Sequence, residues 1–146
     1  AALPSMPRLN DDAARTAVAS GVRGSPDLTG FGLLGHLGRA AIESGVDVAI
    51  EVASVPLLPG TRELAEAGSM PGGSRRNLEW ADERLDRGGF DELDVLLLAD
   101  AQTSGGLVFG VDPTEVDGVL AELDSTGHVA AVIGTATAGS GQITLT

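Results

Sequence analysis

A glycine-rich turn that runs into an apolar helix lies near the start of the chain and limits how the rest can fold. Residues 26–37 read PDLTGFGLLGHL, in which leucines recur at helical spacing after the glycines. A helix that begins after such a turn has unpaired backbone N–H groups at the positive end of its dipole, where phosphate binds well. Asp27 and Thr29 add hard oxygen ligands, which Mg²⁺ accepts together with phosphate oxygens and water. The stretch is therefore a candidate phosphate and magnesium site.

The same residues allow two other interpretations. Asp27 or Thr29 caps the helix that follows, since Asp and Thr are favoured at that position. Residues 30–35 also spell G-x-G-x-x-G, and Glu51 follows about 20 residues later, as in a dinucleotide-binding fold. That fingerprint needs a buried strand before its first glycine, whereas residues 20–26 hold one valine among turn-forming residues.

The charge balance bears on the partners of the protein. With 21 acidic and 9 basic residues the formal charge is −12, which argues against nucleic acid or an anionic membrane as a partner. All basic residues are arginines, and there is no cysteine, so this chain supplies neither a lysine base nor a thiolate. The sequence has no apolar run of about 20 residues and no signal-peptide pattern at its start, and a cytoplasmic protein is predicted.

Helical and strand patterns alternate along the chain, which predicts an α/β fold with a mixed β-sheet packed with helices. Residues 1–8 are predicted to be a linker or entry segment, because Pro4 and Pro7 disfavour a helix, and residues 9–146 to be one domain. Helices are expected over 10–21, 33–45, 61–67 and 78–89 and from Pro113 onward, and strands over 46–52, 107–111, 129–135 and, at an edge, 142–145. An irregular loop is expected over 69–77 and a polar turn over 100–106, while residues 95–98 fit a strand or a helix end.

Three further features have a structural and a functional interpretation. Gly72 and Gly73, followed by two arginines, free backbone amides for phosphate, or else form a mobile surface turn. His36 lies in the apolar stripe of its helix, which favours a packed histidine bonded to a backbone carbonyl over a catalytic or metal role. Trp80, the only tryptophan, is expected to anchor the core rather than to serve as a stacking platform.

Four motifs in order resemble selenophosphate synthetase, also called selenide, water dikinase. Residues 27–37 are similar to the family signature D-x-T-G-F-G-L-L-G-H-L, residues 71–77 to its P-G-G-T-x-x-N loop, residues 100–107 to its D-P-Q-T-S-G-G-L, and residues 132–134 to its closing V-I-G. The resemblance covers about residues 9 to 136. Ala101 replaces the usual proline, and the Gly-Ser-Pro before Asp27 also departs from the family pattern.

The resemblance implies a fold like the C-terminal domain of aminoimidazole ribonucleotide synthetase and an activity that converts ATP, water and hydrogen selenide into selenophosphate, AMP and orthophosphate. It implies that Asp27 is a Mg²⁺ ligand across an interdomain cleft, which Thr29, Gly30, Gly72, Gly73 and Asn77 line as substrate-binding residues. No catalytic residue is expected in this chain, since the family's catalytic cysteine or selenocysteine and its essential lysine belong to an N-terminal domain.

The resemblance also sets the expected partners. The chain is expected to work with its own N-terminal ATP-binding domain, in a full-length enzyme that is a homodimer, and to be inactive alone. A non-catalytic interaction domain of the same fold remains an alternative.

Overall fold

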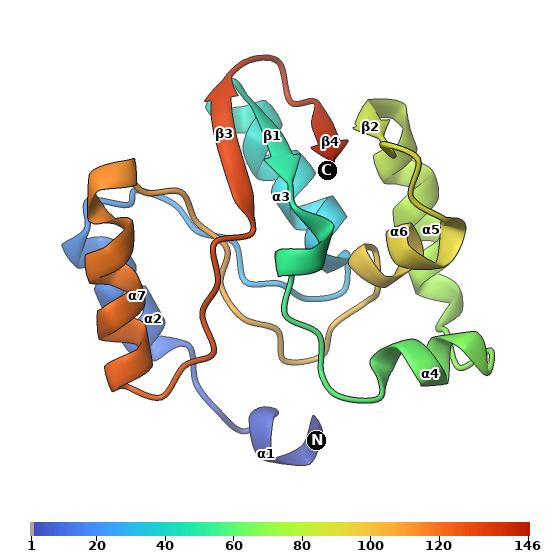
Figure 1. Ribbon diagram of the computed structural model, residues 1–146, viewed down its shortest axis with the longest axis horizontal. Helices are drawn as coiled ribbons and strands as arrows, with labels where there is room; N and C mark the ends of the chain where they lie inside the picture. The colour runs from blue at the N-terminus through green and yellow to red at the C-terminus, as the bar shows by residue number, and fades with distance from the viewer. Residues whose placement is uncertain (1) are drawn as a thin grey trace.

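A computed structural model describes residues 2–146 and contains a mixed four-stranded β-sheet, which lies in the upper part of Figure 1. The strands lie in the order β2-β4-β1-β3. β1 (Val46–Ile50) runs antiparallel to β3 (Gly134–Ala138) and parallel to β4 (Ile143–Leu145), which runs parallel to β2 (Leu85–Asp86). The predicted α/β fold with a mixed sheet is confirmed.

Helices account for most of the regular structure around this sheet. The described part of the chain has α1 (Ala2–Ser5), α2 (Asp11–Ala19), α3 (Gly32–Ser44), α4 (Thr61–Glu66), α5 (Gly72–Ala81), α6 (Glu92–Leu98) and α7 (Val116–Ser125), with 3-10 turns at Val52–Ser54, Asp82–Arg84 and Pro113–Glu115. Within residues 2–146, none of these helices has the length and apolarity that crossing a bilayer requires.

Four helices form where their apolar spacing predicted them: α2, α3, α4 and α7. α3 ends at Gly45, whose φ of 64° is left-handed and lets its N–H reach the carbonyls of Ala41 and Ile42. Pro113 opens the turn that leads into α7, as expected of a residue without an N–H. These ends are local features, so the sequence specifies them well.

The strands agree less well with the pattern. β1 forms where the alternation predicted a strand, but it ends at Ile50, which is its one fully buried residue. β3 begins at Gly134 rather than at residue 129. Residues 107–111 form no strand, because their backbone makes only an isolated bridge, between Leu107 and Asp27. β4, expected at an edge, lies between β1 and β2. Alternating apolar and polar residues predict which side of a strand is buried, but they do not predict which other strands pair with that strand.

Two of the predicted irregular or undecided segments are helical. The expected loop over 69–77 is wrong from Gly72 onward, since α5 begins there and buries Ser74, Asn77 and Leu78 at helical spacing. Its two glycines have low helix propensity and hide the pattern. Residues 95–98 are the buried second half of α6, which begins where the Asp91 carboxylate accepts a hydrogen bond of 2.8 Å from Asp94 N–H.

The expected charged helix over 78–89 is confirmed only as far as Ala81 and is wrong beyond it. α5 ends at Ala81 and gives way to a 3-10 turn and to β2. Trp80 does not anchor the core, because it is 51% exposed and only covers Gly38 from outside, with its ring 3.5 Å from where a Cβ on Gly38 would lie. The two positions of the helix that face inward are instead taken by Leu78 and Ala81.

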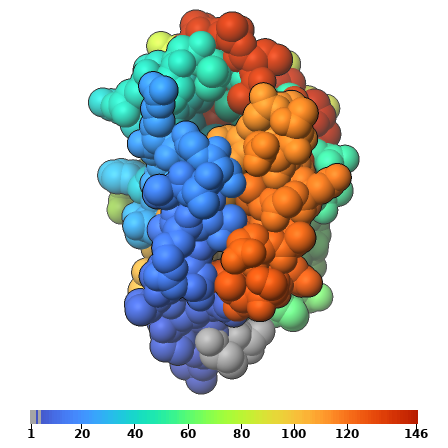
Figure 2. Space-filling view, turned by 90° about the vertical axis from the view of Figure 1, so that its left-hand side faces the viewer, coloured from blue at the N-terminus to red at the C-terminus, as the bar shows by residue number. Residues whose placement is uncertain are grey.

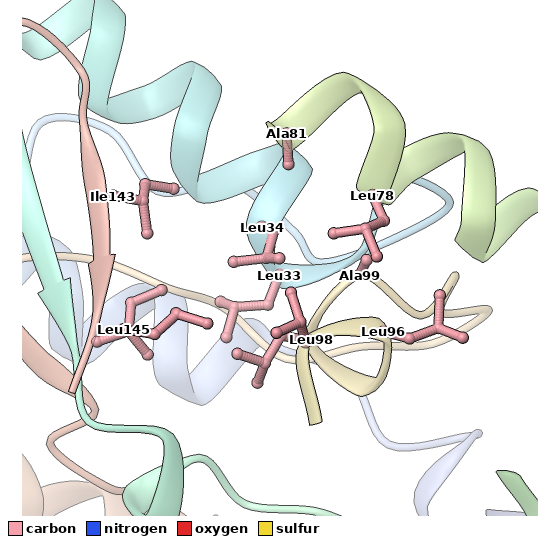
Figure 3. Close-up of a cluster of buried hydrophobic side chains, with 11 residues drawn as sticks. Leu33, Leu34, Leu78, Ala81, Leu96, Leu98, Ala99, Ile143 and Leu145 are labelled. Atoms are coloured by element: carbon pink, nitrogen blue, oxygen red, sulfur yellow. The ribbon is translucent and has the colours of Figure 1, made fainter. Parts of the chain in front are cut away.

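The main hydrophobic core lies between the sheet and three helices (Figure 3). Leu34, Ile50, Val95 and Leu145 are its largest fully buried apolar side chains. They come from α3, β1, α6 and β4 respectively, so one cluster joins elements from about a quarter of the way along the chain to its end. Because Leu33 and Leu34 belong to the first turn of α3, this core also fixes where the glycine-rich turn ends.

A second, smaller core joins the two ends of the chain. α2 lies against α7, as Figure 2 shows, and Ala13 packs on Val119 and Leu123. The guanidinium of Arg8 donates to the carbonyls of Thr126 and Gly127, at 2.5 and 2.7 Å, where α7 ends. The segment before Arg8, expected as a linker or strand, contains the helical turn α1. The segment that leads into α2 is thereby attached to the end of α7.

Asp47 in β1 organises the turn between β3 and β4. Its Oδ1 accepts hydrogen bonds from the backbone N–H groups of Gln142, Ser140 and Gly141, at 2.9, 2.7 and 3.0 Å. The Gln142 and Ser140 bonds, followed by that of Gly141, lower the pKa of Asp47 below its ordinary value, although partial burial opposes this. The charged carboxylate therefore stabilises the folded state.

We expect Asp47→Asn to lower the Tm near neutral pH and to have little effect in strong acid. A carboxyl whose pKa is lower in the folded state stabilises it fully above its unfolded pKa, near 4, and loses that contribution as the pH falls through the folded pKa. Thermal unfolding between about pH 7 and pH 2.5 measures this. Glu79→Gln, on the exposed side of α5, is the matched control, and an equal pH dependence in both variants would contradict the assignment.

Candidate functional site

Three of the four motifs meet in space although they are far apart in the sequence. Leu28 N–H donates to the Gly106 carbonyl at 2.9 Å, and Gln102 N–H donates to the Thr29 carbonyl at 3.0 Å. The Asn77 side-chain amide of α5 donates to the Gly30 carbonyl at 2.8 Å. The glycine-rich turn is thus held by the polar segment 100–106 and by α5.

The Asp27 carboxylate is exposed and only partly engaged. Its Oδ1 accepts a hydrogen bond of 3.0 Å from Asn10 Nδ2, and its Oδ2 has no partner among residues 2–146. Asp27 does not cap α3, and neither does Thr29, because Phe31 occupies the capping position without a side-chain bond. The capping interpretation is therefore wrong, and one carboxylate oxygen stays available for a ligand.

Thr29 is bound to His36 one helical turn into α3. Its backbone N–H and its hydroxyl lie 3.1 and 3.0 Å from His36 Nε2. Nε2 accepts the backbone N–H, and the Thr29 hydroxyl lies within hydrogen-bond distance of the same nitrogen. The His36 ring also packs edge-on against Phe31, with ring centroids 5.6 Å apart. His36 was expected to be a packed histidine bonded to a carbonyl, whereas it is only half-buried and its backbone partner is an N–H group.

A groove of about 760 Å³ opens beside the carboxylate. It runs between the segment that leads into α2, α2 itself and the glycine-rich turn, and its walls include Asn10, Asp27, Thr29, Arg23, Ser104 and Gly105. Of the predicted site residues, Asp27 and Thr29 line this groove, whereas Gly30, Gly72, Gly73 and Asn77 do not. The structure therefore separates the predicted site into two groups.

The second group lies around the start of α5. Gly72 and Gly73 are the first two residues of that helix, and Gly30 is exposed in the turn before α3. Asn77 is 9% exposed and donates both amide hydrogens to the protein, to the Gly30 carbonyl and to the Ala99 carbonyl at 3.0 Å. Asn77 therefore holds the turn from behind.

Asn10, Ser74 and Asp100 belong to the same network and were not predicted as site residues. The fully buried Ser74 donates to Asp100 Oδ1 at 2.6 Å and accepts from Ala101 N–H at 3.3 Å. Asn10 was interpreted as the start of α2 only, although its side chain makes no capping bond there. Asp100 opens the third motif, which was the one signal that pointed to it.

The residues at the groove fit a magnesium ion in part. The exposed carboxylate of Asp27 supplies a hard oxygen ligand of the kind that Mg²⁺ takes from proteins. In the described part of the chain, no group of three or more His, Cys, Asp or Glu side chains is placed to hold a metal. Asp27 therefore suits one position of an octahedron whose other ligands come from phosphate oxygens, water and other protein groups.

The dinucleotide interpretation lacks its structural context. Between residue 2 and Gly30 the chain forms helices and irregular segments, and no strand precedes the first glycine of the fingerprint. Gly32 has a φ of 67°, and a Cβ there would lie 2.6 Å from the Ala99 carbonyl carbon and oxygen. This glycine is thus required for close packing against the end of α6 rather than for approach to a ligand.

Comparison with known proteins agrees with this arrangement. Residues 1–145 match the family described as "AIR synthase related protein, C-terminal domain", and the chain belongs to that family. Within it, the chain is similar to curated proteins named selenide, water dikinase, which confirms the predicted resemblance to the C-terminal domain of selenophosphate synthetase.

The similarity to two of these relatives covers nearly the whole chain. The chain is 42% identical to the Porphyromonas gingivalis protein and 39% identical to that of Carboxydothermus hydrogenoformans, in each case over 94% of this chain and 40% of the relative. It is 45% identical to the Bordetella bronchiseptica protein over 72% of this chain and 30% of the relative. The chain thus spans about 40% of the length of the first two relatives.

Proposed function

We propose that this chain is the C-terminal domain of an ATP-dependent enzyme that makes selenophosphate, AMP and orthophosphate from selenide, ATP and water. The family match and the name shared by the curated relatives support this assignment. The relatives are longer than this chain, so the proposed enzyme joins it to an N-terminal ATP-binding domain. We call that protein the two-domain enzyme, and we expect it to be a cytoplasmic homodimer.

The observation that carries the proposal is the half-engaged carboxylate of Asp27 at the groove. One oxygen is held by Asn10 and the other has no partner among the residues that the structure describes, which is what a residue needs in order to lend a single bond to a metal held mainly elsewhere. When bound, Mg²⁺ would neutralise charge on the phosphates of ATP during phosphoryl transfer. Asp27 would hold the ion, and the groove would receive the nucleotide's phosphate end.

The other predicted residues have different roles in this proposal: some line the groove, some offer backbone N–H groups, and one positions the turn. Thr29 lines the groove, with its hydroxyl oriented by His36, and Gly30 lies beside it in the same turn. Gly72 and Gly73 offer backbone N–H groups at the start of α5, where helix geometry favours an anion. Asn77 acts as a positioning residue, since its amide hydrogens are used by Gly30 and Ala99.

The chain by itself lacks the groups that the reaction needs. It has no cysteine and no lysine, and a single carboxylate binds Mg²⁺ weakly. We therefore expect the isolated chain to hydrolyse no ATP above the buffer blank, whereas the two-domain enzyme releases AMP and orthophosphate from ATP only when selenide is present. Chromatographic measurement of AMP tests both statements.

Two results would contradict the proposal. ATP hydrolysis by the isolated chain would mean that its own residues perform the chemistry. Turnover of ATP by the two-domain enzyme that does not depend on selenide would mean that the acceptor is a different compound.

A further inference from the structure

Asn10 has an unusual hydrogen-bonding pattern for its position. It precedes the first residue of α2, where an Asn side chain ordinarily caps the helix and stabilises it by about 1 kcal/mol. Here the side chain makes no capping bond. Its amide instead donates to Asp27 Oδ1 and to the Gly105 carbonyl, both at 3.0 Å. The Asn10 side chain thus forms two hydrogen bonds with distant segments in place of the local capping bond that would stabilise α2.

The chemistry of the two partners makes this arrangement specific. The carboxylate oxygen of Asp27 and the carbonyl oxygen of Gly105 are both acceptors. Within the Asn10 side chain, only the NH₂ group can therefore bind them, and its two hydrogens serve one acceptor each. The backbone of Asp27 is held separately, by its bridge to Leu107. Asn10 is therefore the group that sets the rotation of the carboxylate, because it is the sole partner of Asp27's side chain among residues 2–146.

We propose that Asn10 is a positioning residue that orients the Asp27 carboxylate so that it binds a divalent cation through Oδ2 alone. The inference rests on the proposed function, since it needs Asp27 to be a metal ligand. Ligating carboxylates are commonly held by hydrogen bonds from outside the coordination shell, and loss of such a partner costs about 10- to 100-fold in metal affinity. Asn10 donates such a bond without adding a charge that would compete with the metal.

The test is Mn²⁺ binding to the two-domain enzyme in the presence of a non-hydrolysable ATP analogue, followed by electron paramagnetic resonance. We expect Asn10→Ala to weaken Mn²⁺ binding by about 10- to 100-fold. Ser125→Ala is the control, because Ser125 does not line the groove and its hydroxyl donates to the Glu122 carbonyl at 2.8 Å, at the end of α7. It should leave Mn²⁺ binding within about twofold of the unmodified enzyme.

A double variant separates positioning from general structural support. If Asn10 acts through Asp27, then Asn10→Ala combined with Asp27→Asn should bind Mn²⁺ no more weakly than Asp27→Asn alone. Losses that add, or unchanged binding in Asn10→Ala, would overturn the inference. Asn10→Ser keeps a residue favoured at a helix start and replaces the alanine variant if that variant fails to fold.

The outcomes also distinguish this inference from the proposal beneath it. Unchanged Mn²⁺ binding in Asp27→Asn would show that Asp27 is not a ligand, and both would then fail. Weakened binding in Asp27→Asn with normal binding in Asn10→Ala would leave the proposed function standing and remove only the role of Asn10.

Discussion

Asp27→Asn is expected to lower the selenide-dependent activity of the two-domain enzyme by at least about 100-fold, which corresponds to about 2.7 kcal/mol of transition-state stabilisation. The substitution removes the negative charge that would hold Mg²⁺ and keeps the shape of the side chain. The amide oxygen of the new Asn can still accept the hydrogen bond from Asn10. We therefore expect the Tm to change little, and the Mg²⁺ concentration that gives half-maximal activity to rise.

The control for this prediction is Asp11→Asn. Asp11 lies in the wall of the same groove, but its carboxylate is paired with Arg15 at 3.3 Å. If the negative potential of the groove were all that mattered, both variants would lose activity to a similar extent. Full activity in Asp27→Asn would instead favour a non-catalytic interaction domain. Initial rates at several Mg²⁺ concentrations, with thermal unfolding curves for each variant, decide between these results.

Gly105→Ala is expected to destabilise the chain by about 3 kcal/mol or more and to lower its Tm by roughly 10 °C. A Cβ at this position would lie 2.0 Å from the Leu28 carbonyl oxygen and 2.9 Å from the Leu28 carbonyl carbon. Both are backbone atoms, so a side-chain rotation cannot relieve the overlap. The two segments would have to separate, which would break the bond from Leu28 N–H to the Gly106 carbonyl.

The neighbouring glycine provides the matched control. A Cβ on Gly106 meets no atom within 4 Å, and Gly106 is exposed. Gly106→Ala should therefore change the free energy of unfolding by no more than about 0.5 kcal/mol. Equal destabilisation of the two variants in urea or thermal unfolding would show that the close approach of residues 28 and 105 is not what Gly105 serves.

The predictions made from sequence succeeded where a feature depends on neighbours along the chain. Apolar residues at helical spacing located α3 and α7, and the glycine at position 45 marked the end of α3 correctly. Alternation located β1. The carboxylate at position 27 was singled out because it precedes a glycine-rich turn, and the structure leaves that carboxylate exposed beside a groove.

The same approach failed where local signals conflict or are silent. Two glycines at the start of α5 suggested a loop, yet burial of Ser74 and Leu78 outweighs their low helix propensity. Trp80 was expected in the core because it is large and apolar, but the buried face of α5 carries Leu78 and Ala81 and leaves Trp80 exposed. No periodicity reported that β4 would have a neighbour on each side.

Local chemistry set the helix ends, the turns and the identity of the residues that can bind a ligand, because capping, glycine conformation and side-chain charge act within a few positions. Packing of the whole chain set which of these residues meet. Asn10 and Gly105 are 95 positions apart, and the bond between them forms only because α2, the glycine-rich turn and the segment after α6 are folded against one another. Packing of distant segments also decided that Asp27 faces a groove rather than its own helix, because the residues that surround its carboxylate are far from it in the sequence.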